Sequence, residues 1–176
     1  MKFYGKCLLA AQLLAGLLFV SSAQALTVEQ IYSMPDLTPD KFASLFSDFK
    51  FHFHEEVQDF DTFVSSKSGD CDDYATLAAD VLSRHGYTPR LIAVRMRGET
   101  HVVCYIEETG SYLDYNTRKD SNKLVSCSPG LTDIARSVAK SFGKDWIATY
   151  EFTYSKREKV KRLVNQIIYP QSRNPA

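Results

Sequence analysis

The sequence predicts a single α+β domain in which a cysteine-bearing helix packs on an antiparallel β-meander. Between Asp70 and Gly86 an apolar stripe recurs at helical spacing; its members are Tyr74, Leu77, Ala78, Val81 and Leu82. Beyond Gly86 the pattern changes to three β-type runs, PRLIAVRMR, HVVCYIEE and SYLDYNTR, which Gly98 and the tripeptide ETG separate. Connections this short make neighbouring strands antiparallel. A helix followed by such strands indicates the α+β class.

The first 25 residues have the three-part pattern of a secretory signal peptide. Lys2 and Lys6 give a positive start, the stretch 8–20 is apolar, and Ala23-Gln24-Ala25 is a small-residue cleavage site. An uncleaved membrane anchor is less favoured, because the apolar stretch is short for a membrane span. Cys7 precedes that stretch, which argues against lipid attachment. We therefore expect a signal peptide over residues 1–25, no stable membrane span after cleavage, and a periplasmic or secreted domain over residues 26–176.

The composition of the remaining chain limits its partners. Acidic and basic residues nearly balance, so no nucleic-acid partner is indicated. Three cysteines remain, Cys71, Cys104 and Cys127, and an odd number leaves at least one thiol unpaired in an oxidising compartment. None has the C-x-x-C spacing of a structural zinc site.

A helix is expected to begin near residue 38. Thr38 is a capping residue, Pro39 suits the first turn, and Asp40 lies near the positive end of the helix dipole. Aromatic and aliphatic residues then follow at helical spacing and predict a buried stripe of Phe42, Leu45, Phe46 and Phe49.

The stretch FKFHFH predicts a short extended segment, because Phe51 and Phe53 alternate with His52 and His54. We interpret the two histidines as an exposed polar face. A metal site is the less favoured interpretation, since no clustered acid or cysteine lies nearby in the sequence.

Three further elements are expected towards the C-terminus. Residues 129–142 predict a helix, WIATYEFTY a fourth strand, and residues 155–168 a last helix. The apolar stripe of that last helix would be Val160, Leu163, Val164, Ile167 and Ile168. Its basic residues are interpreted as a solvated face rather than a docking surface for an acidic partner.

Cys71 lies where the central helix should begin. Asp70 is a good N-cap, and Asp73 is placed to complete a capping box. A nucleophilic cysteine needs a nearby base, and the base needs a group that holds its ring. His101 at the start of one strand and Asp114 on the next supply these residue types, since consecutive strands lie only about 4.8 Å apart.

The segments SGDCDDYATLAADVLSRHGY and HVVCYIEETGSYLDYN resemble the transglutaminase-like superfamily, in particular bacterial transglutaminase-like cysteine proteinases. The hallmark of that family is a cysteine at a helix start in a G-D-C-x-D-[YF]-A context, followed by a histidine and an aspartate on adjacent strands. The cysteine motif is matched by Gly69, Asp70, Cys71, Asp73, Tyr74 and Ala75. His101 and Asp114 match the other two members, and the resemblance spans residues 65–116.

This resemblance implies a papain/transglutaminase-like core and a cysteine hydrolase, favoured as a protease acting on a protein or peptide. Cys71 would attack the carbonyl, His101 would transfer the proton and Asp114 would orient His101, with no cofactor required. A transglutaminase-type acyltransferase and a non-catalytic peptide-binding module of the same fold are the alternatives. The long cysteine-to-histidine spacing of papain is absent, so the likeness to papain is limited to chemistry and core layout.

The acids beside Cys71 oppose a thiolate, whereas the helix start and a protonated His101 favour one. Asp70 and Asp73 are therefore expected to cap the helix. Some relatives in this family bind calcium beside the equivalent acids, which makes Asp70, Asp72 and Asp73 weak calcium candidates. Gln58 or a backbone group upstream of Cys71 is the candidate for the second oxyanion-hole donor.

Two structural expectations follow. Any internal disulfide should join Cys104 to Cys127, which leaves Cys71 as the reactive thiol. His101 and Asp114 must also face the same side of adjacent strands. This requirement predicts a four-residue loop over residues 107–110 with Gly110 in a left-handed conformation, and it places Asp114 diagonal to His101.

Overall fold

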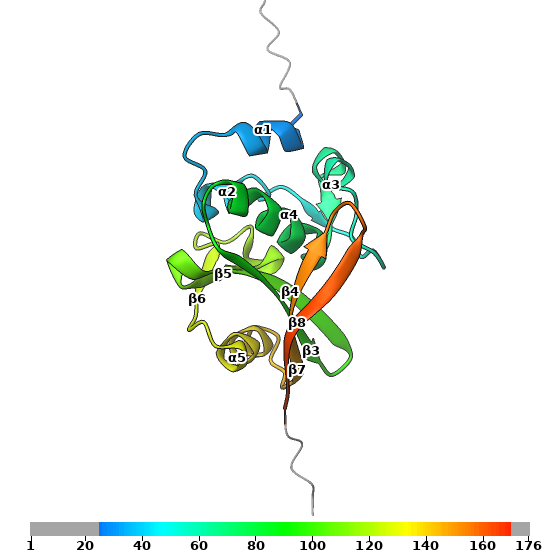
Figure 1. The fold of residues 1–176 in the computed structure, drawn as a ribbon, viewed down its shortest axis with the longest axis vertical. Helices are drawn as coiled ribbons and strands as arrows, with labels where there is room; N and C mark the ends of the chain where they lie inside the picture. The colour runs from blue at the N-terminus through cyan, green and yellow to red at the C-terminus, as the bar shows by residue number, and fades with distance from the viewer. Residues whose placement is uncertain (1–24, 170–176) are drawn as a thin grey trace, which may run out of the picture.

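The computed structural model describes residues 25–169, and the predicted signal peptide lies outside this range except for Ala25. A six-stranded antiparallel sheet in the order β6-β5-β4-β3-β7-β8 forms the centre, with α4 on one face and α5 on the other (Figure 1). The elements are α1 (Val28–Ser33), α2 (Pro39–Ser44), β1 (Lys50–Phe51), α3 (Phe60–Ser66), β2 (Ser68–Gly69), α4 (Cys71–Arg84), β3 (Pro89–Met96), β4 (Glu99–Ile106), η1 (Glu107–Thr109), β5 (Ser111–Leu113), η2 (Tyr115–Thr117), β6 (Leu124–Ser126), α5 (Leu131–Ser141), β7 (Trp146–Ser155) and β8 (Val160–Ile168). The predicted α+β class and antiparallel meander are confirmed.

The register of β4 and β5 agrees with the prediction. Tyr105 pairs with Tyr112 and Ile106 with Ser111, so four residues connect the strands, and Gly110 has φ 57° in the left-handed region. The intervening residues form the short helix η1. This register turns His101 and Asp114 to the same face of the sheet, because paired residues of antiparallel strands share a face.

The predicted last helix is wrong. Residues 160–168 form strand β8, which pairs along its length with β7 at one edge of the sheet. The apolar spacing resembled a helix because the β7–β8 register shifts beside Val164, which breaks the simple alternation of a strand. Pairing with β7 makes this segment a strand and not a helix. Its valines and isoleucines also favour a strand.

Alternating residues of the sheet supply two hydrophobic clusters. Leu91, Val102 and Cys104 pack with α4 on one face, whereas Ile92, Val103 and Tyr105 pack with α5 on the other. Cys127 packs against the α5 cluster, so Cys104 and Cys127 lie on opposite faces. The expected Cys104–Cys127 disulfide is therefore wrong, and among residues 25–169 all three cysteines are free thiols.

Within residues 25–169 no helix is both long and apolar enough to cross a membrane.

Candidate functional site

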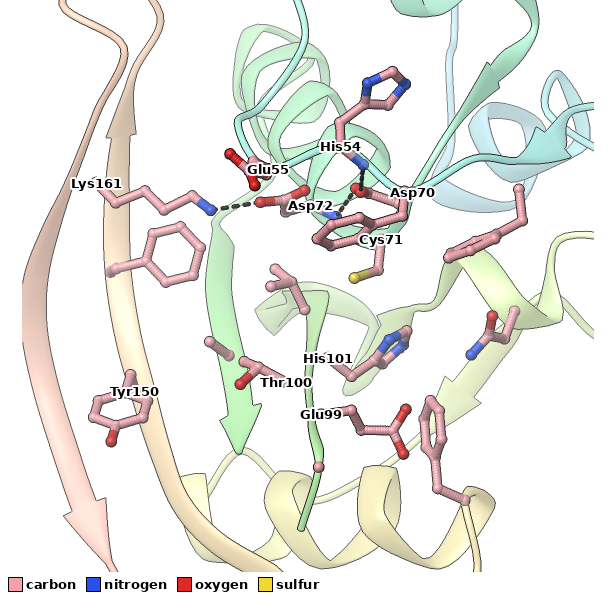
Figure 2. A pocket seen from close by; sticks show the side chains of 18 of the residues that line it. His54, Glu55, Asp70, Cys71, Asp72, Glu99, Thr100, His101, Tyr150 and Lys161 are labelled. Atoms are coloured by element: carbon pink, nitrogen blue, oxygen red, sulfur yellow. Dashed lines mark hydrogen bonds and ion pairs between the residues drawn. The ribbon is translucent and has the colours of Figure 1, made fainter. Parts of the chain in front are cut away.

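Cys71 is the first residue of α4, and the aspartates around it hold the start of that helix (Figure 2). The Asp70 carboxylate accepts hydrogen bonds from the backbone N–H groups of Asp72 and Asp73, and Asp73 accepts from the backbone N–H of Asp70. This is the predicted capping box. The Cys71 backbone N–H donates no hydrogen bond to any described residue. It therefore remains available at the positive end of the helix dipole.

Gln58 supports the capping box and does not point to the thiol. Its backbone N–H and its side-chain Nε2 both donate to Asp73, each at 2.7 Å, and Nε2 also donates to the Ser68 carbonyl at 3.1 Å. Both amide hydrogens are thus committed. The prediction of Gln58 as an oxyanion-hole donor is wrong, because the buried Asp73 carboxylate requires these donors.

His101 on β4 and Asp114 after β5 form a buried pair. His101 Nε2 lies 2.8 Å from Asp114 Oδ1, and both residues are almost inaccessible to solvent. The same Oδ1 accepts the backbone N–H of Asn116 at 2.8 Å, which fixes the carboxylate. With Nε2 bound to Asp114, Nδ1 is the ring nitrogen left to interact with Cys71. The structure thus brings Cys71, His101 and Asp114 together.

The pKa of His101 reflects this arrangement. Burial lowers it, but the hydrogen bond to Asp114 and the interaction with Cys71 outweigh burial and raise it from 6.5 to about 10. At neutral pH the ring is therefore an imidazolium. A protonated imidazole beside a thiol favours the thiolate.

This raised pKa predicts how stability depends on pH. Because the folded-state pKa of about 10 exceeds the ordinary 6.5, the protonated ring stabilises the fold fully below pH 6.5, and this contribution is lost as pH rises through 10. We expect the free energy of unfolding, measured in urea, to decrease between pH 7 and 10 by a few kcal/mol at most. The decrease should be smaller in Asp114→Asn; equal slopes would contradict the role of this pair.

The acids beside Cys71 carry less negative charge than the sequence suggests. Burial and the neighbouring Asp72 carboxyl raise the pKa of Asp70. Burial opposes a low pKa at Asp72, but hydrogen bonds with Asp70 and Lys161 lower it. The raised pKa of Asp70, together with the ion pair from Asp72 to Lys161 of β8, therefore reduces the electrostatic opposition to a thiolate.

These acids do not fit a resident calcium ion. Oxygen atoms of Asp70, Asp72 and Asp73 lie within 4.8 Å of one another. However, Asp72 binds Lys161, Asp73 binds Gln58, and Asp70 accepts the backbone N–H of His54 at 2.9 Å. Calcium takes six to eight oxygen ligands and would have to displace these donors. The arrangement favours helix capping.

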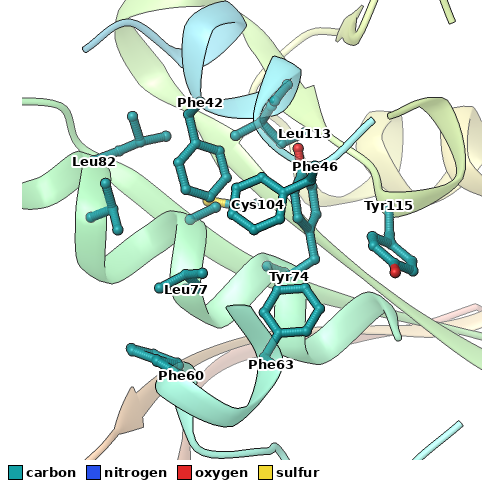
Figure 3. Close-up of a cluster of buried hydrophobic side chains, with 14 of the residues drawn as sticks. Phe42, Phe46, Phe60, Phe63, Tyr74, Leu77, Leu82, Cys104, Leu113 and Tyr115 are labelled. Atoms are coloured by element: carbon teal, nitrogen blue, oxygen red, sulfur yellow. The ribbon is translucent and has the colours of Figure 1, made fainter. Parts of the chain in front are cut away.

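An aromatic cluster anchors the start of α4 (Figure 3). The ring of Tyr74, one turn after Cys71, lies 5.6 Å from Phe42, 5.3 Å from Phe46 and 5.5 Å from Tyr115. Such pairs add stability beyond the burial of area. The packing links α2, α4 and η2, so it fixes Cys71 relative to the segment that follows Asp114.

Cys71 and His101 open into a groove of about 850 Å³. Aromatic and aliphatic residues from distant segments line it: Phe51, Phe53, Ala93, Val102, Phe142, Tyr150, Phe152 and Leu163. Phe51 and Phe53 are 63% and 69% exposed, so the phenylalanines of FKFHFH are exposed as well as His52. The strand there is only Lys50–Phe51, and His54 also lines the groove. The alternation of Phe51 and Phe53 with histidines was a sequence signal for part of the groove. No sequence pattern indicated that Tyr150, Phe152 and Leu163 would line it.

Comparison with known families agrees with this geometry. The sequence model of the family described as transglutaminase-like domain matches residues 22–119, which is more than half of the chain. The chain therefore belongs to the transglutaminase-like domain family. The matched segment contains Cys71, His101 and Asp114. No curated protein matches the chain.

Proposed function

We propose that the protein is a cysteine hydrolase that cleaves amide bonds in a protein or peptide, with Cys71, His101 and Asp114 as its catalytic residues. The observation that carries this proposal is the position of His101: its ring shares a groove with the Cys71 thiol, while its Nε2 is bound to Asp114. A nucleophile, a base and an orienting carboxylate in this order are the arrangement that acyl transfer requires.

The reaction proceeds in two stages. The Cys71 thiolate attacks the substrate carbonyl, and His101 gives its proton to the leaving amine as the C–N bond breaks, which leaves a thioester. Water then attacks the thioester while His101 accepts one of its protons, and the carboxylic acid leaves as the Cys71 thiolate is restored beside the protonated His101. The free backbone N–H of Cys71 is one donor for the oxyanion in both stages.

The first test is selective alkylation. Of the three cysteines, Cys71 and Cys127 are partly exposed and Cys104 is buried. Burial also raises the pKa of the Cys104 thiol. We expect limiting iodoacetamide to label Cys71 first, then Cys127, and Cys104 only after unfolding, as read by peptide mass spectrometry. His101→Ala should slow labelling of Cys71 and leave Cys127 unchanged. Equal labelling of Cys71 and Cys127 in the native protein would overturn the proposal.

The second test asks whether water or an amine accepts the acyl group from Cys71. Peptide substrates are incubated with and without a primary amine. Hydrolysis gives free carboxylates in both cases. A transglutaminase-type acyltransferase would instead give amides that contain the added amine, because the amine displaces Cys71 from the thioester. A protein that binds the peptides but turns over none of them would be a binding module of the same fold.

We also propose export, on the signal-peptide pattern of residues 1–25. The expected result of expressing the full chain in a bacterium is a periplasmic or secreted product whose first residue is Leu26. A protein that stays in the cytoplasm with residues 1–25 still attached would contradict the proposed export.

A further inference from the structure

The sheet extends beyond the helix that carries Cys71. Helix α4 packs on β3 and β4, and β7 and β8 continue the sheet on the far side of β3 (Figure 1). In the register, Ala93 pairs with Tyr150, and Phe152 pairs with Leu163. These four residues therefore share one face. All four line the groove that contains Cys71. We call them the sheet floor.

Three exposed apolar residues line the groove around this floor. Leu163 on β8 is 58% exposed, and Phe51 and Phe53, which also line the groove, are exposed still more. Large apolar side chains that gather around a groove mark a binding surface. The floor lies on strands and is therefore preformed.

The charges at the groove disfavour an acidic ligand. Lys161 lines the groove, but it is bound to Asp72, and its ammonium lies 5.8 Å from the centre of the Phe152 ring. The acids Glu55, Glu99 and Asp70 also line the groove, and Glu99 is paired with Lys144. A substrate carboxylate would find no unpaired lysine or arginine among the described residues that line it.

The order of strands indicates which part of a substrate meets the floor. Asp114 follows β5 and His101 is on β4, whereas the floor lies on β3, β7 and β8. The leaving group takes its proton from His101 and therefore lies on the His101 side of Cys71. The acyl part must then extend away from His101, towards β7 and β8. Figure 2 shows Tyr150 and Lys161 on this side of Cys71.

We infer, given the hydrolase proposed above, that the acyl part of the substrate carries a bulky apolar side chain, aromatic or large aliphatic, that lies against Tyr150, Phe152 and Leu163 in the groove that Phe53 also lines. Burying such a side chain removes apolar area from water on both partners. Small or acidic residues at this position gain nothing from the floor.

The test compares inactivation by four tripeptidyl acyloxymethyl ketones, which alkylate a nucleophilic cysteine and mimic only the acyl part. One probe is tri-alanine, and the others carry a phenylalanine at the first, second or third residue. At least one phenylalanine probe should inactivate with a second-order rate constant about tenfold or more above that of tri-alanine. If no phenylalanine probe exceeds tri-alanine while iodoacetamide still labels Cys71 first, the inference is wrong and the hydrolase proposal stands. If Cys71 is not preferentially labelled by iodoacetamide, both fall.

A matched pair of variants locates the effect. Leu163 and Val164 are adjacent on β8 and equally exposed, at 58% and 59%, but only Leu163 lines the groove. Leu163→Ser should reduce the ratio of phenylalanine-probe to tri-alanine rates several-fold, whereas Val164→Ser should leave the ratio unchanged. Both thermal midpoints should stay near that of the parent. Equal ratios in the two variants would overturn the inference.

Discussion

Replacing Asp114 by asparagine is expected to lower kcat on the order of 100-fold or more while the protein stays folded. Asp114 Oδ1 accepts hydrogen bonds from His101 Nε2 and from the backbone N–H of Asn116. An asparagine oxygen in the same place can accept both hydrogen bonds. The ring therefore keeps its orientation. An amide, however, stabilises the imidazolium poorly, so less of the His101 ring carries the proton that the leaving amine needs.

The pH profile separates this effect from a simple loss of structure. With Asp114, the alkaline limb of kcat/KM should follow the His101 pKa of about 10. Without the carboxylate charge, the limb should lie about 1–3 pH units lower. The measurement is initial rates across pH together with the thermal midpoint. An unchanged limb with unchanged kcat would show that Asp114 is not the orienting residue.

Replacing Gly69 by alanine is expected to lower the stability of the protein, because among the described glycines a Cβ at Gly69 would meet the closest contacts. A Cβ at this position would lie 2.5 Å from Asp73 Oδ2 and 2.6 Å from the Phe63 ring, closer than atoms can pack. Phe63 is fully buried, and Asp73 is held by Gln58 and by the Asp70 N–H. Asp73 cannot move without breaking the capping box, and Phe63 cannot move without disturbing its packing against Phe46 and Phe49. Overpacking of this kind typically costs about 1–3 kcal/mol.

The control for Gly69→Ala is Ser68→Ala, on the neighbouring residue of β2. The Ser68 side chain makes no hydrogen bond in the described part of the chain, because its partners use only its carbonyl. Urea unfolding should show a stability loss for Gly69→Ala and almost none for Ser68→Ala. Iodoacetamide labelling of Cys71 should also change in Gly69→Ala, since the start of α4 moves. Equal stability of the two variants would mean that β2 adjusts without disturbing Asp73.

Local chemistry accounts for the parts of this protein that the sequence determined. The start of α4 follows from Asp70 and Asp73, whose side chains bond to backbone N–H groups within three residues. The pairing of β4 with β5 follows from the length of the loop, because side chains alternate strictly along a strand. The requirement that His101 and Asp114 share a face is what predicted that register. These interactions connect residues that are close along the chain, so residue type and spacing are sufficient.

Tertiary pairing decided the rest. Segment 160–168 had helical spacing, yet pairing with β7 satisfies its backbone hydrogen bonds on both sides of the register shift at Val164. Gln58 was free to be an oxyanion donor until the fold placed it beside Asp73, and Cys104 and Cys127 were free to pair until the sheet separated them. The groove also depends on the tertiary structure. Phe53, Tyr150 and Leu163 come together only when three distant segments pack around Cys71. Contacts between segments far apart in sequence depend on which surfaces the whole chain can bury at once, and no local pattern carries that information.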